Sequence, residues 1–154
     1  MTRLCCDVLS RLEGKTLATA ESLTGGGIGA ALTAIPGSSA VYKGGVISYT
    51  DEVKHKLLGV PREMLASFGA VSAPVARSMA EGARKVTSAD VAVSVTGLAG
   101  PGGDDFGHDV GTVFIGYADG DRSFALEHHF CGDREAVRDQ TIRAALMLVL
   151  ENNS

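Results

Sequence analysis

Segments with the apolar pattern of strands alternate along the chain with segments that have the apolar spacing of helices. Short apolar or β-branched runs, typical of buried strands, occur at residues 16–20, 41–49 and 91–95, and two further runs at 111–118 and 123–130 flank the turn dipeptide Asp119-Gly120. Segments with helical spacing lie between and around them, at residues 4–12, 28–34, 61–68, 75–86 and 134–150. Because helices and strands intermix and one hairpin comes late, the pattern predicts one three-layer α/β/α domain over residues 1–154, with a mixed sheet.

Caps and breakers refine these elements. We expect Asp51 to be the N-cap of a short helix after the second strand, and Pro61 to lie in the first turn of the next helix. The pair Gly44-Gly45 lies inside the predicted strand at 41–49. Glycines in a strand interior predict a β-bulge or a close approach of another backbone.

The composition supports a folded core. Apolar residues make up 45% of the 154 residues and charged residues 21%, which excludes an intrinsically disordered chain. The 20 glycines are about 13% of the chain, against a usual share of roughly 7%. They cluster at residues 25–27, 44–45 and 97–103, where they predict loops that another group approaches closely.

Charge and cysteine usage narrow the class of partner. The formal net charge is −4 and no basic stripe is visible, so we do not expect nucleic acid as a partner. The longest apolar run, residues 144–150, is far shorter than the ~20 residues of a membrane span, and no signal peptide is apparent. Cys5, Cys6 and Cys131 are odd in number and form no disulfide framework, which favours the cytoplasm.

Two glycine-rich loops follow predicted strands, at residues 22–27 and 96–103. Ligands of open α/β sheets gather at the carboxyl ends of strands, and backbone N–H groups freed by glycines can hold an anion. The first loop is neither a P-loop nor a G-x-G-x-x-G motif. A phosphate or nucleotide site and simple tight turns therefore both remain open on this pattern alone.

Ser22 and Lys54 are the main candidates for a nucleophile and its base. Ser22 lies at a predicted strand-to-helix turn beside three glycines, where it is either a nucleophile or the N-cap of the helix. A serine nucleophile needs a base, and a desolvated lysine can act as one. Lys54 follows the second strand by about one helical turn, but taken alone a surface charge is the favoured interpretation.

The histidines offer weaker alternatives. None of the four has an acidic partner at a spacing that indicates a Ser-His-Asp triad. His108, with Asp104, Asp105 and Asp109, has the ligand types for a divalent ion, although a solvated acidic loop is the favoured interpretation.

Several blocks together resemble one family, the CinA C-terminal domain, also known as PncC or nicotinamide-nucleotide amidase. In order and spacing the matching blocks are residues 20–26 (AESLTGG), 36–40 (PGSSA), 49–54 (YTDEVK), 69–72 (GAVS), 95–103 (VTGLAGPGG), 110–113 (VGTV) and 132–134 (GDR). Blocks in series over nearly the whole chain are far more specific than any single one.

The resemblance implies hydrolysis of the carboxamide of nicotinamide mononucleotide to nicotinate mononucleotide and ammonia. It implies Ser22 as the nucleophile and Lys54 as its general base, with Tyr49 and Thr96 near the reacting centre. For substrate binding it implies the residues Thr24, Gly25, Gly26, Ser39, Gly97, Gly100 and Arg134, with Arg138 as the alternative phosphate ligand. It implies no metal or organic cofactor, and a homodimer or larger homo-oligomer.

The sequence also departs from the family pattern. Leu23 stands where the family often has Cys, and residues 104–109 lack the Lys-Pro commonly found before the Val-Gly-Thr block. The extra N-terminal domain of the family's longer members does not appear in this sequence. Two other functions therefore remain: a non-catalytic nucleotide-binding module, and a serine amidase or esterase for another substrate.

Overall fold

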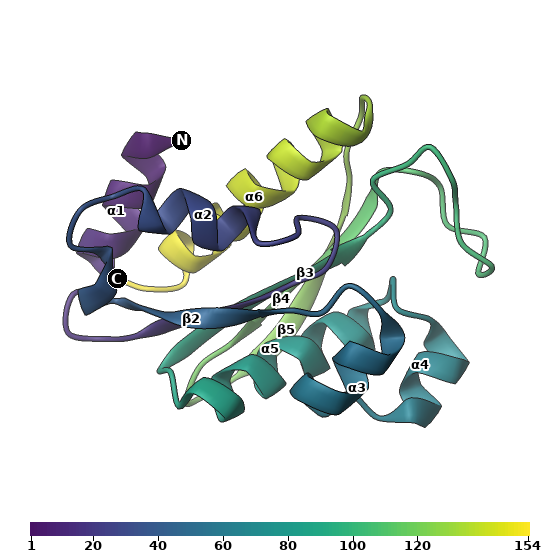
Figure 1. Ribbon diagram of the computed structural model, residues 1–154, viewed down its shortest axis with the longest axis horizontal. Helices are drawn as coiled ribbons and strands as arrows, with labels where there is room; N and C mark the ends of the chain where they lie inside the picture. The colour runs from purple at the N-terminus through teal and green to yellow at the C-terminus, as the bar shows by residue number, and fades with distance from the viewer.

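Five strands form one mixed sheet in the order β2-β1-β3-β4-β5 in the computed structural model, which describes residues 1–154 (Figure 1). The bounds of the strands are β1 Leu17–Glu21, β2 Tyr42–Ile47, β3 Val91–Gly97, β4 Thr112–Ala118 and β5 Ser123–His129. The strands β2, β1 and β3 run parallel, whereas β4 is antiparallel to both β3 and β5. The predicted mixed sheet and its late hairpin are confirmed.

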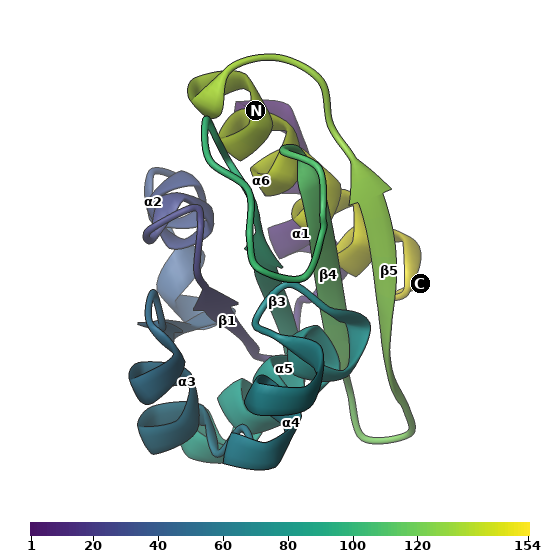
Figure 2. The ribbon, with the colours of Figure 1, turned by 90° about the vertical axis from the view of Figure 1, so that its right-hand side faces the viewer.

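Helices cover both faces of this sheet (Figures 1 and 2). One layer contains α1 (Thr2–Arg11), α2 (Gly27–Thr33) and α6 (Arg134–Glu151). The other contains α3 (Asp51–Leu58), α4 (Arg62–Phe68) and α5 (Ala73–Thr87), and a short 3-10 helix, η1 (Ser38–Ala40), precedes β2. The predicted three-layer α/β/α architecture is therefore correct.

Alternation along the strands builds a separate core on each face. Leu17 and Val93 pack toward α1, α2 and α6, whereas Ala18, Ala20 and Ala92 pack toward α5. The side facing α5 is made of small side chains because that helix lies very close to the sheet. A Cβ atom on Gly116 of β4 would lie only 2.2 Å from the carbonyl oxygen of Ala76 in α5, so glycine is required there for packing.

The apolar run in α6 belongs to the core. Ala145, Leu146, Leu148 and Val149 are buried, and Met147 is 40% exposed. No helix in the molecule has both the length and the apolar character needed to cross a membrane. The hydrophobicity of this segment is explained mainly by packing against the sheet.

The two glycines of β2 behave as their position predicts. The register between β1 and β2 shifts where Leu17 pairs with Tyr42 but Ala18 pairs with Gly44, which leaves one extra residue in β2. A Cβ atom on Gly45 would lie 2.1 Å from Oγ1 of Thr19, so a close approach also occurs at this point.

One predicted cap is displaced by a residue. The N-cap of α3 is Thr50, whose side chain accepts a hydrogen bond from the N–H of Val53 at 3.4 Å. Thr50 has the extended backbone of a cap, whereas Asp51 is already helical and places its carboxylate in the first turn. The prediction that Asp51 caps this helix is wrong, because two good capping residues are adjacent and the sequence does not say which one leaves the helix.

The topology brings three loops together. The parallel strands β1, β2 and β3 end at the same edge of the sheet. The connection from β1 to β2 passes through α2, on one face, and the connection from β2 to β3 passes through α3, α4 and α5, on the other. Connections that leave in opposite directions open a crevice at the carboxyl ends of the strands. Ser22, Tyr49 and Thr96 all lie at this edge.

Candidate active site

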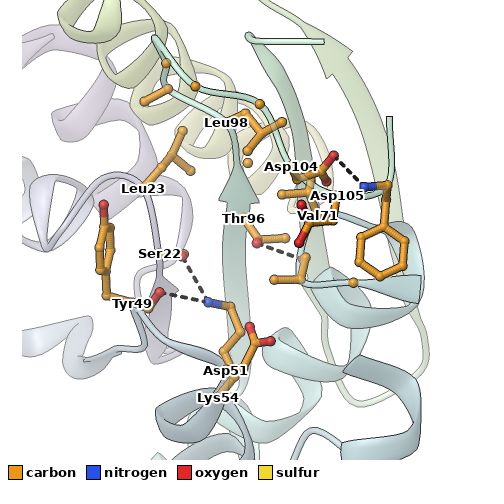
Figure 3. A pocket seen from close by; sticks show the side chains of 18 of the residues that line it. Ser22, Leu23, Tyr49, Asp51, Lys54, Val71, Thr96, Leu98, Asp104 and Asp105 are labelled. Atoms are coloured by element: carbon orange, nitrogen blue, oxygen red, sulfur yellow. Dashed lines mark hydrogen bonds between the residues drawn. The ribbon is translucent and has the colours of Figure 1, made fainter. Parts of the chain in front are cut away.

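A cavity of about 650 Å³ opens at the carboxyl ends of β1 and β3 (Figure 3). Five segments supply its walls: the turn after β1, the segment from the end of β2 into α3, the segment from α4 toward α5, the loop after β3, and the first residue of α6. Of the predicted site residues, those that line it are Ser22, Tyr49, Lys54, Thr96, Gly97, Gly100 and Arg134. Residues from both glycine-rich loops therefore share one cavity.

Ser22 lies on the turn that leaves β1. Its N–H donates to the carbonyl of Val95 at 3.1 Å, which ties the turn to β3, and its carbonyl accepts from the N–H of Gly25 at 3.1 Å. The helix α2 begins five residues later, with Gly26 as its N-cap and no capping side chain. The alternative that Ser22 caps this helix is wrong, and its hydroxyl is left available to the cavity.

Glu21 shapes the same turn, a role that the sequence analysis missed. Its side chain is 2% exposed and accepts hydrogen bonds from Oγ1 of Thr24, from the N–H of Ile28 at 2.8 Å and from the N–H of Gly29 at 3.1 Å. The carboxylate thus takes the place of a capping side chain at the start of α2. An acidic residue at the end of a strand, shortly before an uncapped glycine-rich helix start, is the signal that indicates this role.

The side chain of Lys54 reaches from α3 to the serine. It is 1% exposed, and its Nζ lies 3.0 Å from Oγ of Ser22, 2.7 Å from the carbonyl oxygen of Ser48 and 3.4 Å from that of Tyr49. Figure 3 shows the amine between Ser22 and the backbone of Tyr49. Lys54 is therefore a buried residue of the site and not a surface charge.

These three partners can serve either protonation state of the amine, since an ammonium donates one N–H to each of the three oxygens. The two carbonyl oxygens can only accept hydrogen bonds, whereas the serine hydroxyl can also donate. A neutral amine has two N–H groups for the carbonyls of Ser48 and Tyr49, and one lone pair for the hydroxyl of Ser22. In that state Lys54 is oriented to take the serine proton.

Burial shifts the protonation equilibrium of Lys54 toward this neutral state. Burial lowers the pKa of its amine from 10.5 to about 8, and the nearby carboxylate of Asp51 opposes this shift. At pH 7 about a tenth of the side chain is then neutral, compared with well under a thousandth for an exposed lysine. Asp51, which also lines the cavity, limits how far the pKa falls.

Tyr49 and Arg134 meet at the rim of the cavity. Arg134 donates from Nη1 to the carbonyl of Gly100 at 2.6 Å and from Nη2 to the hydroxyl of Tyr49 at 3.2 Å. It thereby links the first turn of α6 to the loops after β2 and β3. Tyr49 is 60% exposed, so the outer part of this bridge is open to solvent.

Thr96 closes the floor of the cavity near the end of β3. It is 1% exposed, and its hydroxyl donates to the carbonyl of Ala70 at 2.9 Å. This hydrogen bond joins β3 to the segment between α4 and α5, so Thr96 positions two walls of the cavity relative to each other.

Five predicted substrate-binding residues lie outside the cavity wall. Thr24, Gly25 and Gly26 follow Ser22 in the same turn but are not among the residues that line the cavity, and Ser39 is exposed on η1. Arg138 donates from Nε to the carbonyl of Leu23 at 2.9 Å and from Nη2 to that of Thr24 at 3.2 Å. Of the two arginines, only Arg134 faces the cavity.

The loop after β3 is internally braced. Asp104 accepts from the N–H of Phe106 and of His108 at 3.1 and 3.0 Å, and its carboxylate lies 2.7 Å from Nδ1 of His108. The ring of Phe106 packs against Gly69, where a Cβ atom would come within 2.6 Å of it. In Figure 3, Asp104 and Asp105 lie across Thr96 from Ser22. No group of three acidic, histidine or cysteine side chains is arranged to hold a metal ion, so His108 pairs with one aspartate only.

Backbone donors lie next to the serine. The N–H groups of Leu23 and Thr24 donate to no acceptor within the protein. Unpartnered N–H groups in the turn after a nucleophile are the usual means of stabilising an oxyanion. The turn therefore places a serine hydroxyl and two unpartnered N–H groups within three consecutive residues, next to the amine of Lys54.

Known proteins are similar to this chain in sequence. A "CinA-like protein" of Geobacter metallireducens is 49% identical over 138 residues, which are 90% of this chain and 33% of that protein, so the chain spans about a third of the length of such relatives. A Pseudomonas putida protein named nicotinamide-nucleotide amidohydrolase PncC is 48% identical over 83% of this chain and 80% of its own length.

Solved structures of known proteins are similar to this chain in fold. The competence damage-inducible protein A (ComA) of Klebsiella pneumoniae superimposes with a TM-score of 0.96 at 36% identity, covering 98% of this chain and 95% of that one. A competence/damage inducible protein from Agrobacterium tumefaciens gives 0.93 at 38% identity, covering 97% and 93%. The model of the CinA C-terminal domain matches residues 3–152. The chain belongs to the CinA C-terminal domain family.

Proposed function

We propose that this protein is a nicotinamide-nucleotide amidase that hydrolyses the carboxamide of nicotinamide mononucleotide. The observation that carries the proposal is the buried amine of Lys54, 3.0 Å from the hydroxyl of Ser22 and held by two carbonyl oxygens. The name of the Pseudomonas putida relative, with which the chain shares 48% identity, supports this substrate.

The first half of the reaction forms an acyl-enzyme. Neutral Lys54 removes the proton of Ser22 while Oγ attacks the carboxamide carbon, and the N–H groups of the following turn stabilise the oxyanion. The C–N bond then breaks, and the Lys54 ammonium gives its proton to the departing nitrogen, which leaves as ammonia. An amide needs this protonation because NH2− is a poor leaving group, whereas ammonia leaves readily.

The second half regenerates the enzyme. A water molecule, deprotonated by Lys54, attacks the acyl carbon, and the proton returns to Oγ of Ser22 as nicotinate mononucleotide is released. One lysine thus serves as base and acid in both halves, which requires a pKa near the working pH.

The rest of the cavity suits the nucleotide. Arg134 lies at the rim with a guanidinium that can bind a phosphate, and its present partners are a carbonyl and a phenol, not a carboxylate. Its charge is therefore not neutralised by an ion pair. We assign Tyr49 and Thr96 to positions near the reacting centre, and we infer no metal or organic cofactor.

A substrate panel tests this proposal. Ammonia release is measured with nicotinamide mononucleotide, nicotinamide, asparagine and glutamine, and ester cleavage with simple esters. The proposal predicts turnover of the mononucleotide and little of the others, because the phosphoribosyl group supplies binding energy. Faster turnover of an ester or of a free amide would identify a different hydrolase.

The main alternative is a non-catalytic nucleotide-binding module. The altered loop at residues 104–109 favours it, whereas the buried Ser22–Lys54 pair opposes it, because binding alone does not require a desolvated lysine. A nucleotide that raises the melting temperature without being hydrolysed would support this alternative.

Two further features accompany the proposal. Cys5, Cys6 and Cys131 are free thiols, in keeping with a cytoplasmic enzyme. Self-association into a dimer or larger assembly is also proposed. Sedimentation equilibrium tests it, and a monomer at micromolar concentration would contradict it.

A further inference from the structure

Two arginines one helical turn apart on α6 contact different parts of the site. Arg134 reaches over the cavity to Gly100 and Tyr49. Arg138 is half-buried and donates two hydrogen bonds to consecutive carbonyls of the turn that carries the serine, those of Leu23 and Thr24. The second arginine therefore contacts the backbone on which the reaction depends and not the cavity.

Peptide geometry links these carbonyls to the free donors. In a trans peptide the C=O and the N–H point in opposite directions. The carbonyl of Leu23 points at Arg138, so the N–H of Thr24 in the same peptide unit points away from it. That N–H has no acceptor within the protein. Arg138 thus fixes the direction of a donor that the folded chain leaves unused.

The turn is held from a second side by Glu21. Its carboxylate binds Oγ1 of Thr24 and the first N–H groups of α2, whereas the guanidinium binds carbonyl oxygens. Gly25 is in the left-handed region with a φ of +58°, and a Cβ atom on it would lie 3.8 Å from Nη2 of Arg138. The Glu21 carboxylate holds the turn from one side and the Arg138 guanidinium from the other, so its peptide planes have little freedom to rotate.

We propose that Arg138 is a positioning residue for catalysis: it holds the Leu23–Thr24 peptide so that the N–H of Thr24 faces the oxyanion formed on Ser22. This inference rests on the proposed amidase function. It assigns phosphate binding to Arg134 alone and gives the second arginine a role in the transition state.

Kinetics of three arginine variants on α6 test the assignment. Arg138→Met keeps the alkyl chain but removes both hydrogen bonds, Arg138→Lys keeps the charge but cannot span two carbonyls, and Arg143→Met is the matched control on an exposed position of the same helix. We expect Arg138→Met to lower kcat about 10- to 100-fold with KM within about twofold, because a misdirected oxyanion donor affects the transition state more than the bound substrate. Arg138→Lys should be intermediate and Arg143→Met unchanged.

A second readout separates positioning from general disruption. The rate at which a fluorophosphonate labels Ser22 should fall with kcat, since the phosphoryl oxygen uses the same donors, while the pH midpoint near 8 set by Lys54 stays unchanged. Melting temperatures identify variants that fail to fold. If Arg138→Met does not fold, the kcat of Arg138→Lys tests the inference by itself.

The outcomes distinguish the two proposals. A wild-type protein that neither hydrolyses the mononucleotide nor reacts with the fluorophosphonate would overturn the proposed function and this inference with it. An active wild type, with Arg138 variants that keep full kcat or that change only KM, would overturn this inference and leave the amidase proposal standing.

Discussion

The amine of Lys54 lies 3.0 Å from the hydroxyl of Ser22, although 32 residues separate the two along the chain. The contact exists because β1 and β2 are parallel neighbours that end at one edge of the sheet, and because α3 starts directly after β2. The same arrangement removes the lysine from water and lowers the pKa of its amine. Position and protonation state thus have one structural cause.

The pH dependence of turnover should follow this lysine. With a pKa of about 8, the neutral base becomes more populated as the pH rises, so kcat/KM should increase about tenfold per pH unit below 8 and level off above it. Initial rates of ammonia release between pH 6 and 9.5 measure the profile. A rate that stays constant from pH 6 to 8 would rule out a neutral amine as the base.

Stability should reveal the same buried charge. Between pH 8 and 10.5 the unfolded chain holds the Lys54 proton and the folded protein does not, so the lysine's destabilising contribution disappears as the pH rises. The free energy of unfolding of Lys54→Met minus that of wild type should therefore be larger at pH 7 than at pH 10, by about 3 kcal/mol at most. A larger value means that the variant is more stable relative to wild type. Urea denaturation of both proteins at the two pH values tests this difference. A gap that widens toward pH 10 would show the opposite sign.

Arg134 should act on the phosphate. Arg134→Met should raise KM for nicotinamide mononucleotide about 10- to 100-fold, since a charged hydrogen bond contributes roughly 1.5–3 kcal/mol. With nicotinamide riboside, which has no phosphate, the same substitution should change little. Steady-state kinetics with both substrates form the comparison, and equal losses on the two would assign Arg134 to the structure of the rim.

Glu21 should matter for stability as well as rate. Glu21→Ala leaves one buried N–H group, one half-buried N–H group and one buried hydroxyl without their acceptor, which should cost about 2–4 kcal/mol and lower the melting temperature by roughly 4–16 °C. Thermal unfolding followed by circular dichroism measures the loss. Glu13→Ala, at an exposed site near the start of β1, is the control and should leave the melting temperature nearly unchanged.

The fold was largely predictable because it depends on local pattern. Alternating strands, glycine breakers and the Asp119-Gly120 turn fix the elements, and their order favours three layers. The displaced cap at Thr50 shows the limit of local reasoning, since two adjacent residues can each serve as an N-cap.

Of the site residues predicted from the sequence, seven line the cavity and five do not, and the contacts among them were not predicted. A lysine beside Asp51 and Glu52 in a polar segment reads as a surface charge, and its burial results from packing between strands that are distant in sequence. For the same reason the sequence could not separate Arg134 from Arg138: their spacing places both on one side of α6, and only the position of the turn after β1 shows which one contacts its backbone.

Ammonia release from nicotinamide mononucleotide by wild type, Ser22→Ala and Lys54→Met tests the central claim most directly. Lys56→Met, an exposed lysine two residues away on α3, is the matched control. We predict turnover by wild type and Lys56→Met, and a loss of about a thousandfold or more in both dyad variants. A Lys54→Met protein that retains wild-type turnover would contradict the Ser22–Lys54 mechanism.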